Sequence, residues 1–442
     1  MVIFCGFLGK IMLKNINKKL LLIFSLALFL RLSLIFVAYH GDLNNNISWG
    51  KLAVERGLNG FYGFPSESFE KVNWEYSAPN QPPLTILLFA GLRTVWLWVE
   101  RFSWFLNNNI KIFPSGFIWF WELKGMILLV KLPSIFADLG IGLMIYHYVI
   151  NKTKDERKAL ILTVVWLSNP IIWYNSSVWG QTDSVVNLLG LAGVLALMEK
   201  NLVRFVLFFS LSFLFKGSLG IFIPVLGFVA FWKRYKLNDW LKAFVYCLVT
   251  ITLISLWFHP HLNLFVWLFN LYKERILPGE IGYLTANAFN FWWLVDSSKT
   301  LDSALFLGLP ARALGFLVTL AGIVGIDYWL IKKKITNERI FVSLLIVTFV
   351  SFLFMTRIHE RYLYPFFPYA TFLLSSVPVL LIPYIIFSIV HFLNLYHLFW
   401  APPFPLLEGF YKFPVFAQTL SIINIVVFIL LLRLLKHEKD II

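Results

Sequence analysis

Apolar runs of nearly membrane-crossing length recur along most of this chain, and they constrain the fold more than any other feature. About 20 helical residues cross the roughly 30 Å hydrocarbon core of a bilayer. Of the 442 residues, 59% are hydrophobic and only 14% are charged, whereas about 25% are charged in ordinary soluble domains. The sequence therefore predicts an all-α polytopic membrane protein without a large soluble domain.

The expected spans are twelve apolar runs separated by polar clusters. They lie near 20–38, 126–150, 157–174, 184–198, 202–216, 217–232, 240–258, 306–330, 339–356, 362–380, 383–399 and 416–434. Residues 82–122 must contribute an even number of crossings, either as two spans (82–99 and 104–121) or as a re-entrant segment buried in protein. The total is then about 12 to 14 transmembrane helices.

The net charge of +15 follows from basic clusters between the apolar runs and gives no sign of nucleic-acid binding. These clusters are Lys152, Lys154, Arg157 and Lys158; Lys200 and Arg204; Lys233, Arg234 and Lys236; Lys332, Lys333 and Lys334; and Arg433, Lys436 and Lys439. The positive-inside rule assigns them all to the cytoplasmic face. We expect a cytoplasmic segment 1–19, a catalytic transmembrane module 20–380 with external loops 39–81 and 259–305, and C-terminal helices with a cytoplasmic tail over 381–442.

Asp42 follows the first apolar run directly, at the start of the first external loop. A carboxylate at a membrane–water boundary can accept a proton from an attacking hydroxyl when its position and pKa suit that task. The simpler interpretation is an acid that caps the next helix.

Three charged residues fall within or beside apolar runs: Lys131, Asp138 and Lys216. Such residues are costly in a membrane unless they are paired or face a polar cavity. Lys131 and Asp138 are two helical turns apart and share one face, so they could neutralise each other or a neighbouring helix, or contact a substrate. Lys216 could bind phosphate or extend its amine to the interface.

A polar run from Asn169 to Ser184 interrupts the apolar pattern and predicts a loop folded back at the membrane surface. Its amides and indoles suit a sugar, because aromatic faces pack against C–H surfaces while polar groups fix hydroxyls. The candidate pocket residues are Asn175, Trp179, Gln181 and Asp183. An interfacial aromatic belt would explain Trp179 but not its polar neighbours.

The run Arg357-Ile358-His359-Glu360-Arg361-Tyr362 places two guanidiniums, an imidazole and a carboxylate at a span boundary. Because guanidinium matches phosphate in geometry, this run is the best candidate for an anionic headgroup site. A surface ion-pair cluster is the alternative. The histidines do not cluster at ligand spacing, so no metal site is expected.

These motifs, in this order, resemble the GT-C membrane glycosyltransferases over residues 20–370. The residues that carry the resemblance are Gly41-Asp42, Pro82-Pro83-Leu84-Thr85, Lys131-Leu132-Pro133 with Ala137-Asp138-Leu139, Asn169-Pro170, Trp179 to Ser184, Phe215-Lys216, and His359-Glu360-Arg361-Tyr362 with Pro365. The chain is most similar to prokaryotic relatives of the GPI mannosyltransferase II family and, more distantly, to dolichyl-phosphate-glucose glucosyltransferases. Gln81 departs from the pattern, since an aromatic residue often precedes the two prolines.

The resemblance implies a polyprenyl-phosphate sugar as donor, a lipid or lipid-linked glycan as acceptor, and short interfacial helices in loop 39–81. It also implies that Asp42 is the base, and that His359, Glu360 and Arg361 lie near the donor phosphate. Lys216 and Arg357 are further phosphate candidates, and no cofactor is expected. Two other classes remain open: a transporter or flippase, which intramembrane charges fit equally well, and a non-catalytic partner of a glycan-assembly complex.

Overall fold

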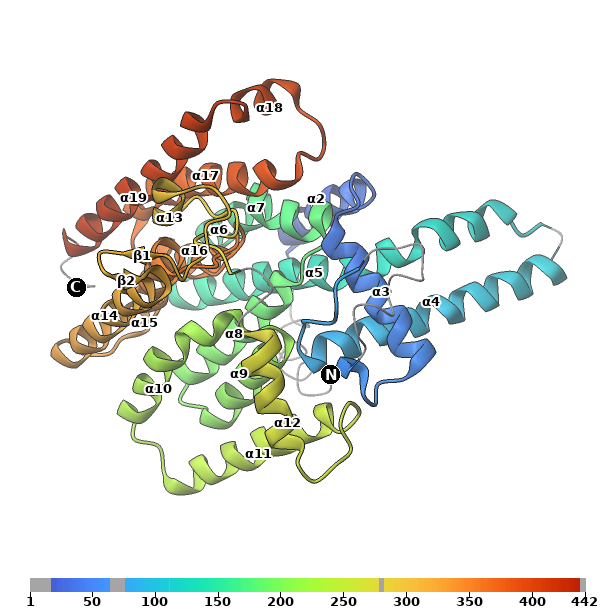
Figure 1. The fold of residues 1–442 in the computed structure, drawn as a ribbon, viewed down its shortest axis with the longest axis horizontal. Helices are drawn as coiled ribbons and strands as arrows, with labels where there is room; N and C mark the ends of the chain where they lie inside the picture. Colours follow the sequence, from blue (N-terminus) through green and yellow to red (C-terminus); the bar gives the residue numbers. More distant parts are fainter. Residues whose placement is uncertain (1–16, 64–75, 111, 278–281, 438–442) are drawn as a thin grey trace.

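The computed structural model describes residues 17–63, 76–110, 112–277 and 282–437, and almost all of its regular structure is helical. Figure 1 shows the helices gathered around a central region, with a single short pair of strands, β1 (Leu305–Phe306) and β2 (Leu309–Pro310). The prediction of an all-α polytopic membrane protein is confirmed. The predictions for segment 1–16 and for the last five residues lie outside the described residues.

Seven helices in the described part of the chain are long and apolar enough to cross a membrane. They are α4 (Pro83–Asn109), α5 (Ser115–Thr153), α11 (Leu237–Ser255), α14 (Ala311–Lys332), α15 (Asn337–Phe354), α17 (Leu381–Phe399, preceded by the 3₁₀ turn η6, Pro378–Leu380) and α19 (Pro414–His437). Every expected run contains helix, but fewer runs reach crossing length than the expected 12 to 14 spans.

Of the expected spans that form shorter helices, three follow one another in the chain. They are α8 (Asp183–Met198), α9 (Leu202–Phe215), and the 3₁₀ turn η4 (Gly217–Phe222) continued by α10 (Ile223–Trp232). At 1.5 Å per residue each is roughly 21 to 24 Å long, which is less than the hydrocarbon thickness. All three have an end at Asp183 or Lys216. Because these helices are short, the polar residues at their ends can lie deeper in the protein than the ends of the longer neighbouring helices.

Residues 82–122 form neither of the two expected arrangements. The helix α4 runs unbroken through the expected gap at 100–103, and α5 begins at Ser115 and continues for 39 residues. The charged residues at 100–101 do not end α4, because their side chains can remain at its surface. The chain turns instead just before Pro114, between the two helices. The two helices lie side by side as a hairpin (Figure 1), in which the indole N–H groups of Trp96 and Trp121 donate to each other's carbonyls at 3.1 and 3.0 Å.

The helix α2 (Lys18–Leu34) leads into a segment that holds α3 (Gly41–Arg56) and the 3₁₀ turn η1 (Phe61–Gly63). Segment 259–305 contains α12 (Leu264–Leu271), the π-helix η5 (Tyr272–Ile276) and α13 (Phe291–Val295), and the segment after α17 contains α18 (Pro405–Tyr411). The aromatic and aliphatic core of α3 and α12 joins them to the α4–α5 hairpin.

The run expected at 157–174 divides at Asn169. The helix α6 (Glu156–Ser168) ends there, and the Asn169 side chain accepts from the Ile171 N–H to cap α7 (Pro170–Trp173). The chain continues as a π-helix, η3 (Tyr174–Trp179), which ends at Gly180 with φ of 85°. Such π-turns often occur at functional sites. The expected run 362–380 contains only a short α-helix, α16 (Phe366–Leu374), followed by the 3₁₀ turn η6.

Candidate active site

Asp42 lies in the first turn of α3, but it is not the cap of that helix. His40 is the N-cap, since its Nδ1 accepts from the Asp42 backbone N–H at 3.0 Å. The Asp42 carboxylate accepts a hydrogen bond from Gln181 Nε2 and lies 3.8 Å from Arg361 Nη2. With 38% of its side chain exposed, the carboxylate is oriented from two sides and still accessible.

Arg361 lies between α15 and α16 and contacts three carboxylates. Its Nη1 donates to Glu360 Oε1 at 2.7 Å, its Nη2 is 3.8 Å from Asp42, and its Nε is 3.8 Å from Asp183 Oδ2. Burial lowers the pKa of Arg361, but the three carboxylates raise it more. Burial likewise raises the pKa of Glu360, but Arg361, His359 and a backbone hydrogen bond together lower that pKa more, to about 2. The pair is therefore charged at every physiological pH.

Lys216 follows the last residue of α9 and is almost fully buried. Its Nζ donates to Asp183 Oδ1 at 2.6 Å and lies 5.7 Å above the Tyr362 ring. Asn175 Nδ2 donates to the other Asp183 oxygen at 3.3 Å. The alternative that Lys216 extends to the interface is wrong, because its amine is held inside the protein by Asp183.

Trp179 lies beneath the guanidinium of Arg361. It is fully buried, with the Arg361 Cζ 5.8 Å from its ring centroid. Its ring also contacts those of His40 (4.8 Å) and Phe399 (6.1 Å). An interfacial belt residue would present its ring to the membrane surface, so that interpretation of Trp179 is wrong.

These residues surround a polar chamber with a volume of about 210 Å³. Its lining consists of Asp42, Asn45, Asn46, Trp49, Ser77, Asn80, Gln81, Thr85, Gln181, Thr182, Lys216, Arg275, Ile276, His359, Arg361 and Tyr362. The structure thus brings together Asp42, Gln181, Lys216, His359 and Arg361, which are more than 300 residues apart at the extremes. Asp183 does not line the chamber, but its carboxylate contacts both Lys216 and Arg361.

A second, lateral cavity of about 480 Å³ shares one wall with the polar chamber. The shared residues are Asn80, Gln81, Lys216, Ile276, Arg361 and Tyr362. Asp183 and Asn187 line its polar end, whereas its far side is formed by apolar residues of η4, α10 and α14. Phe316 and Leu320 on this far side are 58% and 41% exposed, so the cavity reaches an exposed apolar surface of α14.

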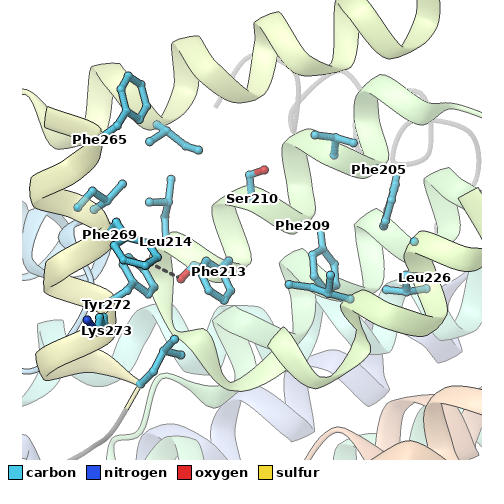
Figure 2. Close-up of a pocket in the computed structure, with 16 residues that line it drawn as sticks. Phe205, Phe209, Ser210, Phe213, Leu214, Leu226, Phe265, Phe269, Tyr272 and Lys273 are labelled. Atoms are coloured by element: carbon cyan, nitrogen blue, oxygen red, sulfur yellow. Dashed lines mark hydrogen bonds between the residues drawn. The ribbon is translucent and has the colours of Figure 1, made fainter. Parts of the chain in front are cut away.

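A third cavity is an apolar groove of about 770 Å³ between α9, α10 and α12. Figure 2 shows Phe205, Phe209 and Phe213 of α9 along it, opposite Phe265 and Phe269 of α12. At its end nearest the polar chamber, the Tyr272 hydroxyl donates to the Phe213 carbonyl at 2.8 Å. The π-helix η5 separates the apolar groove from the polar chamber, since Tyr272 and Lys273 line the groove while Arg275 and Ile276 line the chamber.

Asp138 belongs to a different network from the chamber residues. Its Oδ2 accepts from Arg31 Nε (2.9 Å) and Ser176 (2.6 Å), and its Oδ1 accepts from Ser184 (2.6 Å) and Tyr364 (3.2 Å). Arg31 and Asp138 are completely buried. Asp138 is therefore neutralised by a neighbouring helix, which was one of its alternatives, and it lines neither the chamber nor the lateral cavity.

Lys131 is also removed from the chamber. Its Nζ donates to three backbone carbonyls, those of Ile35 (2.7 Å), Ala38 (3.1 Å) and Val178 (2.8 Å). Ile35 and Ala38 follow α2, and Val178 is near the end of η3. Carbonyls at the end of a helix have no hydrogen-bond partner within that helix. Lys131 thus holds the backbone before Asp42 against the backbone before Gln181, and its expected place in a sugar pocket is not found.

Arg357 and Glu360 do not line the chamber either. Arg357 binds Asp302 through two nitrogens, at 2.6 and 3.1 Å, and so orients the backbone before His359. Glu360 is fully buried and acts through Arg361. Among the described residues, no group of three or more His, Cys, Asp or Glu could hold a metal, and the expected absence of a metal stays a prediction.

Sequence reasoning missed Arg31 and much of the chamber wall. Arg31 lies inside an apolar run, so the rule that flagged Lys131 applied to it equally. Asp42, Asn45, Asn46 and Trp49 have the i, i+3, i+4, i+7 spacing of one helical face, and all four line the chamber. Asn80 and Arg275 carry no such local signal.

Fold and site together define an all-α polytopic membrane protein with a charged chamber between its helices. Neither a scan against protein-family models nor a search of curated proteins finds a match to this chain. Its function must therefore be inferred from the chamber itself.

Proposed function

We propose that this protein is a membrane glycosyltransferase that moves a hexose, such as mannose, from a polyprenyl-phosphate donor to a lipid or lipid-linked glycan acceptor at the extracytoplasmic face of the cell membrane. One observation carries the proposal. Asp42, Lys216 and Arg361 line one chamber, and that chamber shares a wall with a cavity whose far side is apolar and exposed.

A polyprenyl-phosphate sugar has three parts that need three environments. Its hydrocarbon chain needs apolar surface, its phosphate needs cations, and its sugar needs polar side chains. The lateral cavity offers apolar residues of α14 at one end and Lys216 with Arg361 at the other. The polar chamber beyond them offers the amides of Asn45, Asn80 and Gln181.

The phosphate is the leaving group in this transfer. The bond between the anomeric carbon and the phosphate oxygen breaks, and its electron pair remains on that oxygen. Positioned cations stabilise such a developing charge. The buried Lys216 and Arg361, whose side chain is 11% exposed, both lie on the shared wall. The guanidinium of Arg361 can offer a planar fork of donors to the phosphate oxygens.

The acceptor hydroxyl attacks the anomeric carbon from the side opposite the phosphate. A new carbon–oxygen bond forms, and the hydroxyl proton passes to Asp42, which acts as general base. Gln181 and Arg361 hold one Asp42 oxygen, so the carboxylate has a fixed direction toward the chamber. In-line displacement of this kind inverts the configuration of the anomeric carbon.

The direct test is transfer by the purified protein in vesicles. A panel of radiolabelled polyprenyl-phosphate sugars is supplied, with a membrane lipid extract as acceptor, and the labelled products are separated by chromatography. Label from one donor in a new lipid product supports the proposal. Movement of an intact donor across the bilayer without any product would instead indicate a flippase.

A further inference from the structure

His40 makes contacts that the proposed transfer step does not use. It lies two residues before Asp42, and its imidazole contacts the rings of Trp179 and Phe399, with centroid distances of 4.8 and 4.5 Å. Its Nδ1 accepts from the Asp42 N–H at 3.0 Å and lies 3.8 Å from Asp42 Oδ2. One ring thus contacts both the backbone and the carboxylate of Asp42.

We infer that His40 is a positioning residue for Asp42 and that it acts only as a neutral imidazole. The inference rests on the proposed function, in which Asp42 is the base. An Nδ1 atom that accepts from a backbone N–H carries no proton, so the remaining proton of the neutral ring is on Nε2. Protonation would turn this acceptor into a donor and abolish the cap.

The hydrogen bond fixes the first turn of α3. Asp42 is in that turn, and its backbone N–H is one of the groups that has no partner within the helix. The Trp179 ring is tilted against the imidazole and the Phe399 ring meets it edge-on, and these contacts restrict the rotation of the imidazole and so the direction of Nδ1. If the bond is lost, the first turn can fray, and the Asp42 carboxylate loses its fixed direction toward the chamber.

Burial of His40 favours the neutral ring at physiological pH and outweighs the surrounding charges, whose net effect favours protonation. Burial lowers the His40 pKa most strongly, Asp42 from α3 raises it, Arg361 lowers it and Glu360 raises it, with a net decrease from the ordinary value of about 6.5. From η3 and α17 the ring meets Trp179 and Phe399, which carry no charge. Protonation, which would break the cap, is therefore expected only below pH 6.5.

Two substitutions separate the cap from the stacking. His40→Asn keeps a side-chain oxygen that can accept from the same N–H at any pH, but it loses the ring contacts. His40→Phe keeps the ring contacts but offers no acceptor. We expect His40→Phe to lower kcat by roughly 2- to 30-fold, which corresponds to the free energy of a lost N-cap, with little change in the KM for donor. His40→Asn should restore most of that kcat.

The pH profile gives a readout that a purely structural role would not move. Wild-type kcat should fall as pH decreases below 6.5, whereas His40→Asn should keep its kcat until Asp42 itself is protonated. Wild-type thermal stability should fall over the same acidic range and that of His40→Asn should fall less, because the native state disfavours protonated His40.

The assays use the vesicle transfer system described above, with Asp42→Asn as reference. If His40→Phe has the wild-type kcat and pH profile while Asp42→Asn is inactive, the inference is wrong and the proposed function stands. The inference is also wrong if both His40 variants lose stability and activity together with an unchanged pH profile. If Asp42→Asn remains active, Asp42 is not the base and the inference fails with that role. If the wild type itself transfers no label, the proposed function fails.

Discussion

The protein contains two buried arginine–carboxylate networks that differ in how completely they are paired. Arg31 and Asp138 are fully buried, and both Asp138 oxygens accept bonds of 2.6 to 3.2 Å from four side chains. Arg361 keeps 11% of its side chain exposed, makes one short ion pair, with Glu360, and reaches Asp42 and Asp183 only at 3.8 Å. We call the Arg31 network closed, because it is fully buried and both carboxylate oxygens are hydrogen-bonded. We call the Arg361 network open, because it lines a cavity and its longer contacts leave room for a ligand.

The difference indicates what each network does. A closed pair has no capacity for another ligand, and removing one partner would leave a buried charge uncompensated. In the open network the Arg361 Nε has no hydrogen-bond partner among the described residues, so a phosphate could improve on the contacts that exist without it. We assign the Arg31 network to folding and the Arg361 network to binding.

The largest effect is expected from Asp42→Asn, which removes the proposed base and keeps the side-chain shape. Transfer should fall by about 10²- to 10⁴-fold, the usual contribution of general base catalysis, while the melting temperature in detergent stays near that of the wild type. Asp296→Asn is the matched control, since this carboxylate accepts from Ser298 and Thr300 and lines neither the chamber nor the lateral cavity. Equal transfer by Asp42→Asn and Asp296→Asn would remove Asp42 from the mechanism.

Asp138→Asn tests the closed network. It should destabilise the protein by about 3–5 kcal/mol, because the Arg31 charge would lose its buried partner. The measurement is thermal unfolding in detergent, together with the yield of folded protein. Replacing Arg31 and Asp138 together by Met and Leu should restore part of the loss. Normal stability for Asp138→Asn would show that this network does not support the fold as we describe.

Arg361→Ala tests the open network. It should weaken the binding of a polyprenyl phosphate without sugar by about 1.5–3 kcal/mol, the range for a hydrogen bond to a charged group, with a smaller effect on free sugar. Arg357→Ala is the matched control, since Arg357 binds Asp302 and lines neither the chamber nor the lateral cavity. Equal losses for phosphate and sugar would contradict a phosphate contact.

The smallest effect is expected from Gly180→Ala, at the backbone between the two networks. Gly180 has φ of 85°, and an added Cβ would lie 3.1 Å from the Lys131 Cε and 3.3 Å from the Leu43 Cδ1. We expect a loss of about 1 kcal/mol in stability and a modest loss of transfer through displacement of Gln181. Gly409→Ala, at a site with open space around it, should change neither. A Gly180→Ala protein with unchanged stability would contradict the fixed turn.

The fold class follows from composition and apolar periodicity alone, which is why the all-α polytopic prediction is confirmed. The length of each span is harder to predict from the sequence. The helix α9, for example, ends where Lys216 pairs with Asp183, although apolar residues continue beyond it. The α4–α5 hairpin shows the converse, since α4 passes through charged residues that a hydropathy pattern treats as a boundary.

The site was predictable where the signal is local. Asp42, Gln181 and Arg361 each carry polar character at a span boundary, and the structure places them in contact. Pairing between distant residues was not predictable, because nothing in the sequence distinguishes an Arg361 that faces a cavity from an Arg357 that binds Asp302. Lys131 and Asp138 share a helical face as expected, yet each takes partners from other helices.

The most direct test of the account is a structure of the protein in a lipid nanodisc with a non-transferable polyprenyl-phosphate sugar analogue at saturating concentration. We predict phosphate density in contact with Arg361 and Lys216, sugar density in the polar chamber facing Asp42, and the hydrocarbon chain leaving past α14. A bound analogue elsewhere, with Arg361 still held by its three carboxylates, would contradict the account.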